Sequence, residues 1–370
     1  MFVDGYMKTE IGSLTSIKTG KLDANASSEN GIYPFFTCAV EPLKIDSYSY
    51  DCECVLVAGN GDLNVKYYNG KFDAYQRTYI IESKDKSKLT VPYLYYFLES
   101  YIETLRSQSI GGIIKYIKIG NLTNASIPIL SIEKQNKIVK TLDKAKSIIT
   151  HLRIQLEKLD LLVKARFVEM FGDVINNTKR WKIYLFSEIT ISRLGKMLDK
   201  KSQTGKSKLP YLANFNVQWF QFKLDNLNMM DFNEKEQIEF SLEDDDLLVC
   251  EGGEIGRCAI WHNEITPCYF QKALHRVRCN KSIIIPIYLA WWFKFNCDNN
   301  GFSEIEGAKA TIAHLPGAKL KKLPIAVPPL TLQNQFADFV KQVDKSKSIL
   351  QQELDKAQML FDSLMQEYFG

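Results

Sequence analysis

The sequence lacks the features that would place the chain in a membrane or in a secretory pathway. No run approaches the roughly 18 consecutive apolar residues that a membrane-spanning helix needs. The start, MFVDGYMKTE, has an early acid and lacks the apolar segment and small-residue cleavage site of a secretory signal. We therefore expect a soluble protein that stays in the cytoplasm.

The spacing of the cysteines does not match a disulfide framework. The chain has 8 cysteines, and the closest pair, Cys52 and Cys54, does not match the Cys-x2-Cys pairs that are usual in zinc sites. The 4 histidines form no triad-like or metal-like pattern. We expect reduced, mostly buried thiols and no bound metal.

The sequence also lacks a strong charge of either sign. It has 47 Lys and Arg against 43 Asp and Glu, a net charge of +4 and a pI near 8.4. Such a mild excess permits a nucleic-acid partner only if the charge is clustered. A chain of 370 residues with 45% hydrophobic residues is long enough for two ordinary globular domains.

What the sequence does contain is an internal repeat. Residues 135–172 read QNKIVKTLDKAKSIITHLRIQLEKLDLLVKARFVEMFG, and residues 333–370 read QNQFADFVKQVDKSKSILQQELDKAQMLFDSLMQEYFG. The phrases LDKAKSI and VDKSKSI match after a small slip, and both copies end in Phe-Gly. The copies start about 200 residues apart, far more than the roughly 20 to 50 residues of solenoid repeats. The repeat therefore indicates the duplication of a whole module.

Both copies carry a heptad seam, with steps that alternate between four and three residues. In the first copy the seam runs through Ile138, Leu142, Ala145, Ile149, Leu152, Leu156, Leu159, Val163, Arg166 and Met170. In the second it runs through Phe336, Val340, Val343, Lys347, Leu350, Leu354, Ala357, Phe361, Leu364 and Tyr368. We expect two long helices paired as an antiparallel coiled coil that acts as a spacer. The alternative is that each stripe packs on its own globular domain.

The segments before the two helices echo one another in the same order. DCECVLVAGNG, AYQRTYII and VPYLYYFLESY in the first half correspond to DLLVCEGGEIG, YFQKALHRV and IPIYLAWWFKF in the second. Runs of Val, Ile, Leu and Tyr broken by Gly, Asn and Asp predict short strands, and each proline-led aromatic run predicts a short buried helix. The sequence thus predicts an α/β (α+β) chain ordered domain, helix, domain, helix.

In this doubled order the chain resembles the specificity subunits of type I restriction-modification systems. The resemblance covers essentially the whole length and rests on the Gly-rich strand ends, the proline phrases before Gln135 and Gln333, and the endings FVEMFGD and LMQEYFG. IPILSIEKQ departs from VPPLTLQNQ because it lacks the double proline. The resemblance implies target recognition domains at 1–126 and 173–322 and conserved long helices at 127–172 and 323–370, related by an internal pseudo-two-fold repeat.

The resemblance also implies a function. Such a subunit reads a bipartite double-stranded DNA target, with one half-site for each recognition domain, while the paired helices fix the gap and dock two methyltransferase subunits. Motor-nuclease subunits join such an assembly for cleavage. S-adenosylmethionine is then expected on the methyltransferase partner, and no cofactor is expected on this chain.

A basic stretch in the second half is the first candidate for DNA contact. It holds Arg193, Lys196, Lys200, Lys201, Gln203 and Lys206, with Asp199 as its one acid. Such a loop can neutralise phosphates and offer side-chain amides to base edges, although a solvated surface loop is the alternative. Lys18 and Lys21 occupy the corresponding, thinner stretch of the first half. The acidic stretch 225–246 is expected to lie away from DNA.

Further candidates lie where strands are predicted to end. Gly59-Asn60-Gly61 and Gly252-Gly253 allow close approach of the backbone to a ligand. The polar residues nearby in sequence are Asn60, Asn64, Lys66, Gln76, Arg77, Arg257, Gln271 and Lys272. Arg pairs naturally with guanine and Gln or Asn with adenine in the major groove, whereas a structural turn is the alternative for each position.

Catalytic motifs are missing. VLVAGNGD lacks the third spaced glycine of a dinucleotide site, and Lys200 stands where a phosphate-binding loop ending in TGKS would need its first glycine. The double proline of Val327-Pro328-Pro329-Leu330 is not the Asn/Asp-Pro-Pro-aromatic phrase of adenine methyltransferases. We expect no catalysis by the chain alone. A stand-alone DNA-modifying enzyme and a coiled-coil adaptor that binds only proteins are the alternatives.

Overall fold

The chain folds into two compact units. A computed structural model describes residues 7–198, 205–302 and 314–370. Unit 1 comprises Met1–Gln155 and Ile349–Gly370, and unit 2 comprises Leu156–Ser348. The division falls inside the two long helices of the chain, α5 (Ile132–Phe171) and α11 (Leu330–Phe369), so the domain boundaries predicted at 126, 172 and 322 stay a prediction.

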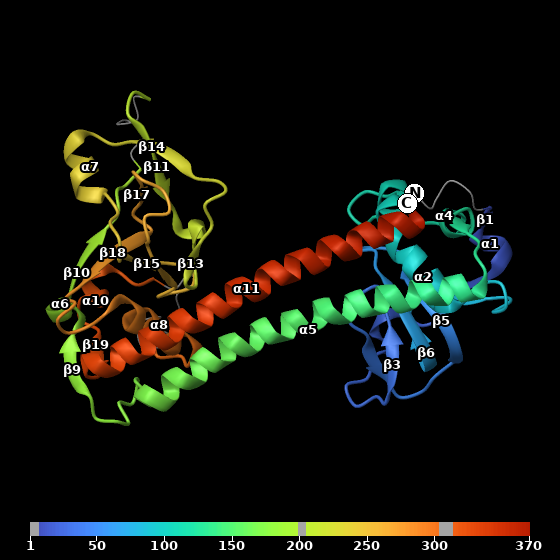
Figure 1. The fold of residues 1–370 in the computed structure, drawn as a ribbon, viewed down its shortest axis with the longest axis horizontal. Helices are drawn as coiled ribbons and strands as arrows, with labels where there is room; N and C mark the ends of the chain where they lie inside the picture. The colour runs from blue at the N-terminus through green and yellow to red at the C-terminus, as the bar shows by residue number, and fades with distance from the viewer. Residues whose placement is uncertain (1–6, 199–204, 303–313) are drawn as a thin grey trace. The chain divides into compact units, whose positions relative to one another are not determined.

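Unit 1 is built on a six-stranded sheet with the order β2-β7-β5-β6-β3-β4 (Figure 1). Its strands are β2 (Thr15–Thr19), β3 (Tyr33–Phe36), β4 (Leu43–Ile45), β5 (Tyr50–Ala58), β6 (Val65–Ala74) and β7 (Thr78–Ser83). A separate pair joins β1 (Lys8–Glu10) to β8 (Ser126–Pro128). The helices are α1 (Ile11–Leu14), α2 (Val91–Ser100), α3 (Ile102–Gln108) and α4 (Ile119–Thr123), with a 3-10 turn η1 (Ala24–Ala26). Neighbouring strands of the large sheet run antiparallel except β3 and β6, which are parallel.

Unit 2 repeats this order in smaller sheets. Its strands are β9 (Lys182–Leu185), β10 (Thr190–Leu194), β11 (Lys208–Leu212), β12 (Val217–Gln218), β13 (Gln221–Phe222), β14 (Asn228–Asp231), β15 (Leu247–Cys250), β16 (Cys258–Ile260), β17 (Tyr269–Phe270), β18 (Leu274–Cys279) and β19 (Pro324–Val327). Its short helices are α6 (Phe186–Ile189), η3 (Asn214–Asn216), α7 (Glu234–Phe240), α8 (Pro286–Asp298) and α10 (Gly317–Leu320). The sheets have the orders β10-β18-β15-β16 and β14-β11-β17, with the pairs β9-β19 and β12-β13.

The sheets of the two units share a pairing pattern. The parallel pair β11 and β17 corresponds to β3 and β6, and the antiparallel partner β14 corresponds to β4. Helix α7 and the β12–β13 hairpin have no counterpart among the described elements of unit 1. The mixed α/β repeat predicted from the sequence is confirmed.

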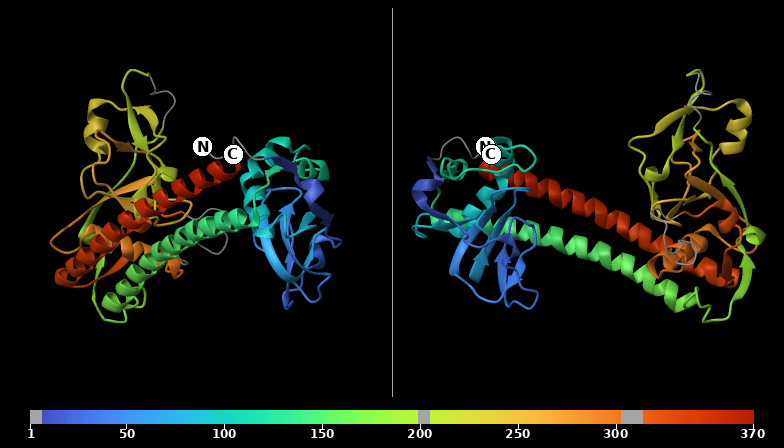
Figure 2. Two further views of the ribbon diagram at one scale, coloured as in Figure 1. Left: turned by 45° about the vertical axis from the view of Figure 1, so that its right-hand side comes forward. Right: turned by 180° about the vertical axis from the view of Figure 1, so that it is seen from behind.

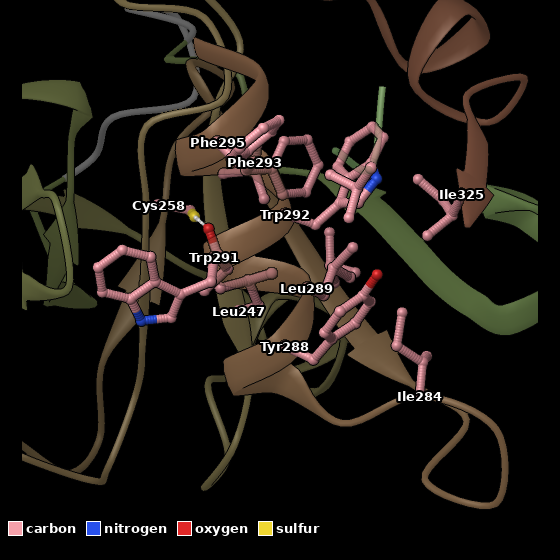
Figure 3. Close-up of a cluster of buried hydrophobic side chains, with 14 of the residues drawn as sticks. Leu247, Cys258, Ile284, Tyr288, Leu289, Trp291, Trp292, Phe293, Phe295 and Ile325 are labelled. Carbon is pink, nitrogen blue, oxygen red and sulfur yellow. Dashed lines mark hydrogen bonds between the residues drawn. The ribbon is translucent and has the colours of Figure 1, made fainter. Parts of the chain in front are cut away.

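The proline-led helices are central to both cores. The Tyr93 hydroxyl of α2 donates to the Pro128 carbonyl at 3.0 Å, and the Tyr288 hydroxyl of α8 donates to the Ala326 carbonyl at 2.5 Å. The Tyr93 ring also packs on Phe369 of α11, with centroids 5.2 Å apart. Figure 3 shows Tyr288 among Leu289, Ile284 and Ile325, all buried. Each core therefore joins the strands and short helices of its unit to parts of the long helices.

Helices α5 and α11 pack antiparallel within each unit, where they lie side by side (Figures 1 and 2). In unit 1 the Arg153 guanidinium donates to the Gln358 side-chain oxygen at 3.3 Å, and in unit 2 the Lys347 ammonium meets the Asp160 carboxylate at 2.5 Å. Later residues of α5 thus meet earlier residues of α11. Every predicted seam position is buried or half-buried, as expected for a coiled-coil stripe.

The end of α5 leaves the predicted seam. The most deeply buried residues there are Phe167 and Phe171, while Arg166 and Met170 are half-buried. The Phe167 ring lies 5.5 Å from Phe336 of α11 and 5.8 Å from Tyr288 of α8. The buried row shifts by one position because α8, in addition to α11, presents an aromatic surface to this turn.

A buried glutamine joins the start of α5 to the start of α2. Gln135 is 0% exposed, and its oxygen accepts the Thr90 backbone N–H at 2.9 Å. Its amide nitrogen donates to the carbonyls of Lys88 at 2.7 Å and Leu130 at 3.0 Å. Thr90 is the N-cap of α2, whose N–H has no partner inside the helix, so Gln135 satisfies a group that burial would otherwise make costly.

Gln333 makes the same connection in unit 2. It is 0% exposed and accepts the N–H of Ile285, the N-cap of α8, at 3.0 Å. Its amide nitrogen donates to the carbonyls of Ile283 at 3.0 Å and Pro328 at 2.8 Å. The repeated Gln-Asn phrase of the sequence thus marks a repeated structural joint.

Among the described residues, no helix is both long and apolar enough to cross a membrane. All 8 cysteines have free thiols, with Cys54, Cys250, Cys258 and Cys268 buried and the other four half-buried. Burial raises the pKa of the Cys250 thiol to about 11. Such thiols are poor nucleophiles at neutral pH.

Candidate nucleic-acid interface

In unit 1 the predicted DNA-contacting residues converge where β2 ends. Gly20, just after β2, donates its N–H to the Thr78 carbonyl at 3.0 Å, and Gly59 donates to the Arg77 carbonyl at 2.8 Å. A Cβ atom on Gly59 would lie 2.4 Å from the Arg77 oxygen, so this close approach requires glycine. The backbone thereby gathers Lys21, Asn60 and Arg77 at one edge, which we call edge 1.

Two other predicted residues of unit 1 hold this edge together. The Asn64 amide donates to the Cys38 carbonyl at 2.8 Å, and the Lys66 ammonium donates to the Asn64 side-chain oxygen. Burial lowers the pKa of Lys66. The side chains of Asn64 and Lys66 are thus engaged with the protein itself and position the loops around them.

The remaining predicted side chains of unit 1 divide into engaged and open ones. Lys18 pairs with Glu82 at 2.6 Å, and the Gln76 amide donates to the Asp23 carboxylate at 2.7 Å. Lys21 and Arg77 are exposed, and neither side chain makes a hydrogen bond or ion pair with any residue that the structure describes. These two cations are the ones at edge 1 that are open to phosphates.

Sequence reasoning missed a hairpin beside edge 1. Ile110 and Tyr116 exchange two backbone hydrogen bonds at 3.0 and 2.8 Å, and Gly61 donates to the Lys115 carbonyl at 2.9 Å. The tip presents Ile113, which is fully exposed. The Gly-Gly in SIGGIIKYIKIGNL signals a tight turn, but only the fold brings that turn next to Gly61.

Unit 2 builds the corresponding edge, which we call edge 2. Gly195 donates to the Leu274 carbonyl at 3.0 Å, Lys272 donates its N–H to the Lys196 carbonyl at 2.9 Å, and Glu251 donates its N–H to the Ala273 carbonyl at 2.9 Å. The loop after β10 and the turn between β17 and β18 are thereby clamped together as in unit 1. Gln271 and Lys272 lie in that turn.

Three predicted cations of unit 2 are neutralised by their surroundings. The Lys196 side chain is 7% exposed, and its ammonium meets the Glu236 carboxylate at 2.5 Å and the Asp231 carbonyl at 2.6 Å. Arg193 pairs with Glu239. The Arg257 guanidinium donates to the Asn214 carbonyl at 3.1 Å and lies 3.6 Å from the Glu254 carboxylate. These side chains shape edge 2 and have little charge left for phosphates.

The partners of Arg193 and Lys196 come from the acidic stretch that we expected to lie away from DNA. Glu236 and Glu239 both stand on α7 and line a cavity of about 700 Å³ together with Arg193, Lys196 and His275. Burial lowers the pKa of His275, whose ring nitrogen contacts the Leu315 carbonyl at 3.0 Å. The acids of α7 therefore belong to the same edge as the basic stretch, which the sequence order alone does not indicate.

The other predicted residues of unit 2 lie partly or fully at the surface, or lie outside the described residues. Gln271 is half-buried and Lys272 is exposed, and neither side chain has a hydrogen-bond partner among the residues that the structure describes. Lys206 is exposed in the turn before β11. Lys200, Lys201 and Gln203 lie outside the described residues.

One acidic group in unit 2 has the spacing of metal ligands. Ligand atoms of Asp244, Asp245 and His262 lie within 4.8 Å of one another. Lys281 meets the Asp245 carboxylate at 2.5 Å, so part of the negative charge is already compensated. An exposed acidic cluster of this kind does not by itself define a metal site.

Sequence comparison identifies the family. The family model described as the type I restriction modification DNA specificity domain matches residues 4–158 and again residues 178–359. The chain belongs to this family. The two matches give one specificity domain to each copy of the duplicated module, and together they include both candidate edges.

A relative from Escherichia coli agrees with this membership. The chain is 37% identical over 179 residues to the type I restriction enzyme EcoDI specificity subunit of Escherichia coli, an alignment that spans 48% of this chain and 40% of that relative. The chain thus matches less than half of the length of that relative.

Solved structures share the fold. The S subunit of a type I restriction-modification system from M. genitalium matches with a TM-score of 0.63 at 17% identity, covering 100% of this chain and 98% of that chain. A chain from a study of complex assembly and conformational transition of the type I R-M system matches with a TM-score of 0.62 at 13% identity, covering 100% and 98%. The specificity-domain fold is therefore shared over the whole length.

Proposed function

We propose that this chain is the DNA-binding specificity subunit of a type I restriction-modification system and reads a bipartite double-stranded target. The observation that supports this most is the repeated edge. In each unit, backbone hydrogen bonds hold the loop after one strand, β2 or β10, against a turn that presents polar side chains. These side chains are Arg77 in unit 1 and Gln271 with Lys272 in unit 2. Two similar but chemically different edges suit two different half-sites.

The side chains would divide the work between phosphates, bases and the shape of the edges. Lys21, Arg77 and Lys272, with Lys200, Lys201 and Lys206, would contact phosphates. Asn60, Gln203 and Gln271 would face base edges. The remaining predicted residues would hold the edges in shape, and these are Lys18, Asn64, Lys66, Gln76, Arg193, Lys196 and Arg257.

The partners follow from the same proposal. Two methyltransferase subunits would dock on α5 and α11, and motor-nuclease subunits would join for cleavage. S-adenosylmethionine would bind to the methyltransferase subunits, and this chain would carry no cofactor and no catalytic group of its own. The assembly would work in the cytoplasm, where the DNA lies.

Methyl transfer tests this division of labour. The purified chain, supplied with S-adenosylmethionine and duplex DNA, is expected to transfer no methyl group until the methyltransferase subunit of the same system is added. Labelled methyl incorporation into DNA is the measurement, and sequencing of the modified bases should then give a split motif. Methylation by the chain alone, at a stoichiometry that excludes contamination, would reject the proposal in favour of a stand-alone enzyme.

Salt dependence tests the role of the open lysines at phosphates. The affinity for DNA falls as the salt concentration rises. The exchange of Lys21 and Lys272 for alanine is expected to make this fall shallower, by about 0.9 in the slope of log affinity against log salt for each duplex phosphate that the variant no longer neutralises. Binding should weaken to a similar degree on all sequences. Lys18→Ala is the matched control, because Lys18 is already paired with Glu82. An equal slope for wild type and double variant would mean that these lysines do not meet DNA.

Gln271 tests direct reading of a base. Gln271→Ala is expected to reduce discrimination at one base pair of one half-site by about 1 to 3 kcal/mol, the usual value of a bidentate base contact. Binding of duplexes with single base-pair changes in each half-site is the measurement. A uniform loss across all of these duplexes would assign Gln271 to the shape of edge 2 instead.

A further inference from the structure

Unit 2 contains a groove that the proposed DNA contacts do not use. A cavity of about 1000 Å³ lies between the β12–β13 hairpin, helix α8 and those parts of α5 and α11 that belong to unit 2. Trp219, Phe220, Phe222 and Trp291 line it, and we call it the aromatic groove. Because its hairpin wall has no counterpart among the described elements of unit 1, the groove is a feature of unit 2.

The tip of the hairpin holds an aromatic ring in a costly conformation. Phe220 has a φ of 61°, a left-handed value that is unfavourable for a bulky side chain. Its N–H donates to the Cys258 carbonyl at 2.9 Å, which fixes the backbone there. The ring stacks on Trp291 at 4.6 Å and is still 37% exposed. Strained residues that the surrounding structure holds in place gather at binding sites.

The floor of the groove contains a polar group without a partner. Trp291 is 9% exposed, and no residue that the structure describes accepts a hydrogen bond from its indole N–H. Figure 3 shows this indole projecting away from Tyr288 and Ile325. A buried indole N–H ordinarily finds an acceptor. An acceptor on a bound partner would complete it.

The charge on the groove is negative. Its lining carries 5 carboxylates against 3 lysines, namely Glu157, Asp160, Glu264, Asp298 and Asp344 against Lys164, Lys294 and Lys347. A net negative lining of this kind repels the phosphate backbone of DNA. It favours a protein segment that carries lysine or arginine.

Three of these carboxylates, Glu157, Glu264 and Asp344, form no ion pair with any residue that the structure describes. Lys164 and Lys294 both meet Asp298, at 2.9 and 2.7 Å. Among the described ion pairs none involves Glu157 of α5 or Asp344 of α11, and burial raises the pKa of the Asp344 carboxyl. A lysine or arginine placed between the two helices would offer both of these exposed carboxylates an opposite charge.

We propose that the aromatic groove docks a segment of one methyltransferase subunit, so that unit 2 binds its methyltransferase more tightly than unit 1 binds the other. The segment would set an apolar side chain against Phe220, a lysine or arginine beside Glu157 and Asp344, and a carbonyl group at the Trp291 indole. This inference rests on the proposed function, which assigns partner docking to the long helices. It adds a difference in affinity between the two docking sites, which the repeated sequence of the two helices does not predict.

The test uses the full chain and the methyltransferase subunit of the same system. Phe220→Ser removes the apolar contact and Asp344→Lys reverses the charge. Phe215→Ser is the control for the first, because Phe215 is 52% exposed in the same unit and does not line the groove. Asp338→Lys is the control for the second, since Asp338 is an exposed acid on the same helix outside the groove. Native mass spectrometry across a range of methyltransferase concentrations gives the fraction of chains with none, one or two partners.

For the wild type we expect two partners that bind in two separate steps. Each groove variant should weaken the tighter step by about tenfold or more, as hot-spot truncations do, and the controls should leave both steps unchanged. Two equal steps in the wild type, or groove variants with unchanged steps, would overturn the inference. Weaker duplex binding by the isolated Phe220→Ser chain, with both methyltransferase steps intact, would overturn it in favour of a DNA groove.

Other outcomes distinguish a failure of the docking site from a failure of the proposed function. A wild type that binds no methyltransferase at all contradicts the proposed function. A wild type that binds two, with no sensitivity at Phe220 or Asp344, contradicts only the docking site. A wild-type chain that dimerises through the groove, and becomes monomeric in the variants, would replace the methyltransferase with a second copy of this chain.

Discussion

A chain with one additional heptad in each long helix is expected to recognise the same two half-sites across a gap about three base pairs wider, since seven residues add roughly 10 Å of helix and each base pair spans about 3.4 Å. Insertion after Leu152 in α5 and after Leu350 in α11 keeps both apolar seams in phase. Each half-site should keep its own bases, because both edges stay intact. Methylation mapping of a host genome that carries the lengthened chain is the measurement.

A control with a heptad in only one helix makes this result interpretable. A heptad in one helix alone should shift one seam against the other and weaken the assembly rather than widen the gap. The rotation of about 100° that three base pairs introduce has to be absorbed by bending or twisting of the DNA. An unchanged gap in a folded, active assembly would show that the paired helices do not set the spacing, and so would a new half-site sequence.

The largest effect on stability is expected for Gln333→Leu. The substitution leaves the Ile285 N–H and the carbonyls of Ile283 and Pro328 without the partner that Gln333 gives them. Each unsatisfied buried polar group costs about 1 to 3 kcal/mol, so with three such groups unit 2 should lose about 3 to 9 kcal/mol of its free energy of unfolding. Urea titration monitored by tryptophan fluorescence suits this measurement, because all five tryptophans lie between residues 181 and 292, within unit 2.

The neighbouring residue supplies the control. Asn334 is exposed on the same turn, and Asn334→Leu should change the free energy of unfolding by no more than about 0.5 kcal/mol. Gln333→Glu keeps an acceptor for Ile285 but removes the donor to the two carbonyls, so it should not restore stability. A stable Glu variant would mean that the donated hydrogen bonds contribute little to the joint.

The seam of the long helices could be predicted from the sequence because a heptad pattern depends only on residues along one helix. The shift to Phe167 and Phe171 could not, because it depends on the aromatic face of α8, more than a hundred positions later in the chain. The same limit applies to Gln135 and Gln333. Their repetition was visible, but their hydrogen bonds join segments 45 to 50 residues apart.

The residue types at the candidate interface could be predicted from the sequence, but the net charge that they leave free for a ligand could not. The stretch from Arg193 to Lys206 is basic when it is read along the chain, yet Glu236 lies 40 positions from Lys196 and still neutralises it. Helix α7 brings those acids back against the strand, and no local pattern encodes that return. Arg77 and Lys272 lie in the turns between β6 and β7 and between β17 and β18, and only the folded backbone brings these turns against Gly59 and Lys196.

Unit 1 contains residues from both ends of the chain, and this affects the order in which the two cores are completed during synthesis. Met365 and Phe369 of α11 belong to the same buried cluster as Tyr93 and Leu142, so the core of unit 1 lacks these two side chains until both residues have left the ribosome. Unit 2 ends at Ser348 and is complete earlier, although it begins later. The core of unit 1 is therefore completed after that of unit 2, and loss of Met365 and Phe369 would damage the N-terminal half of the chain.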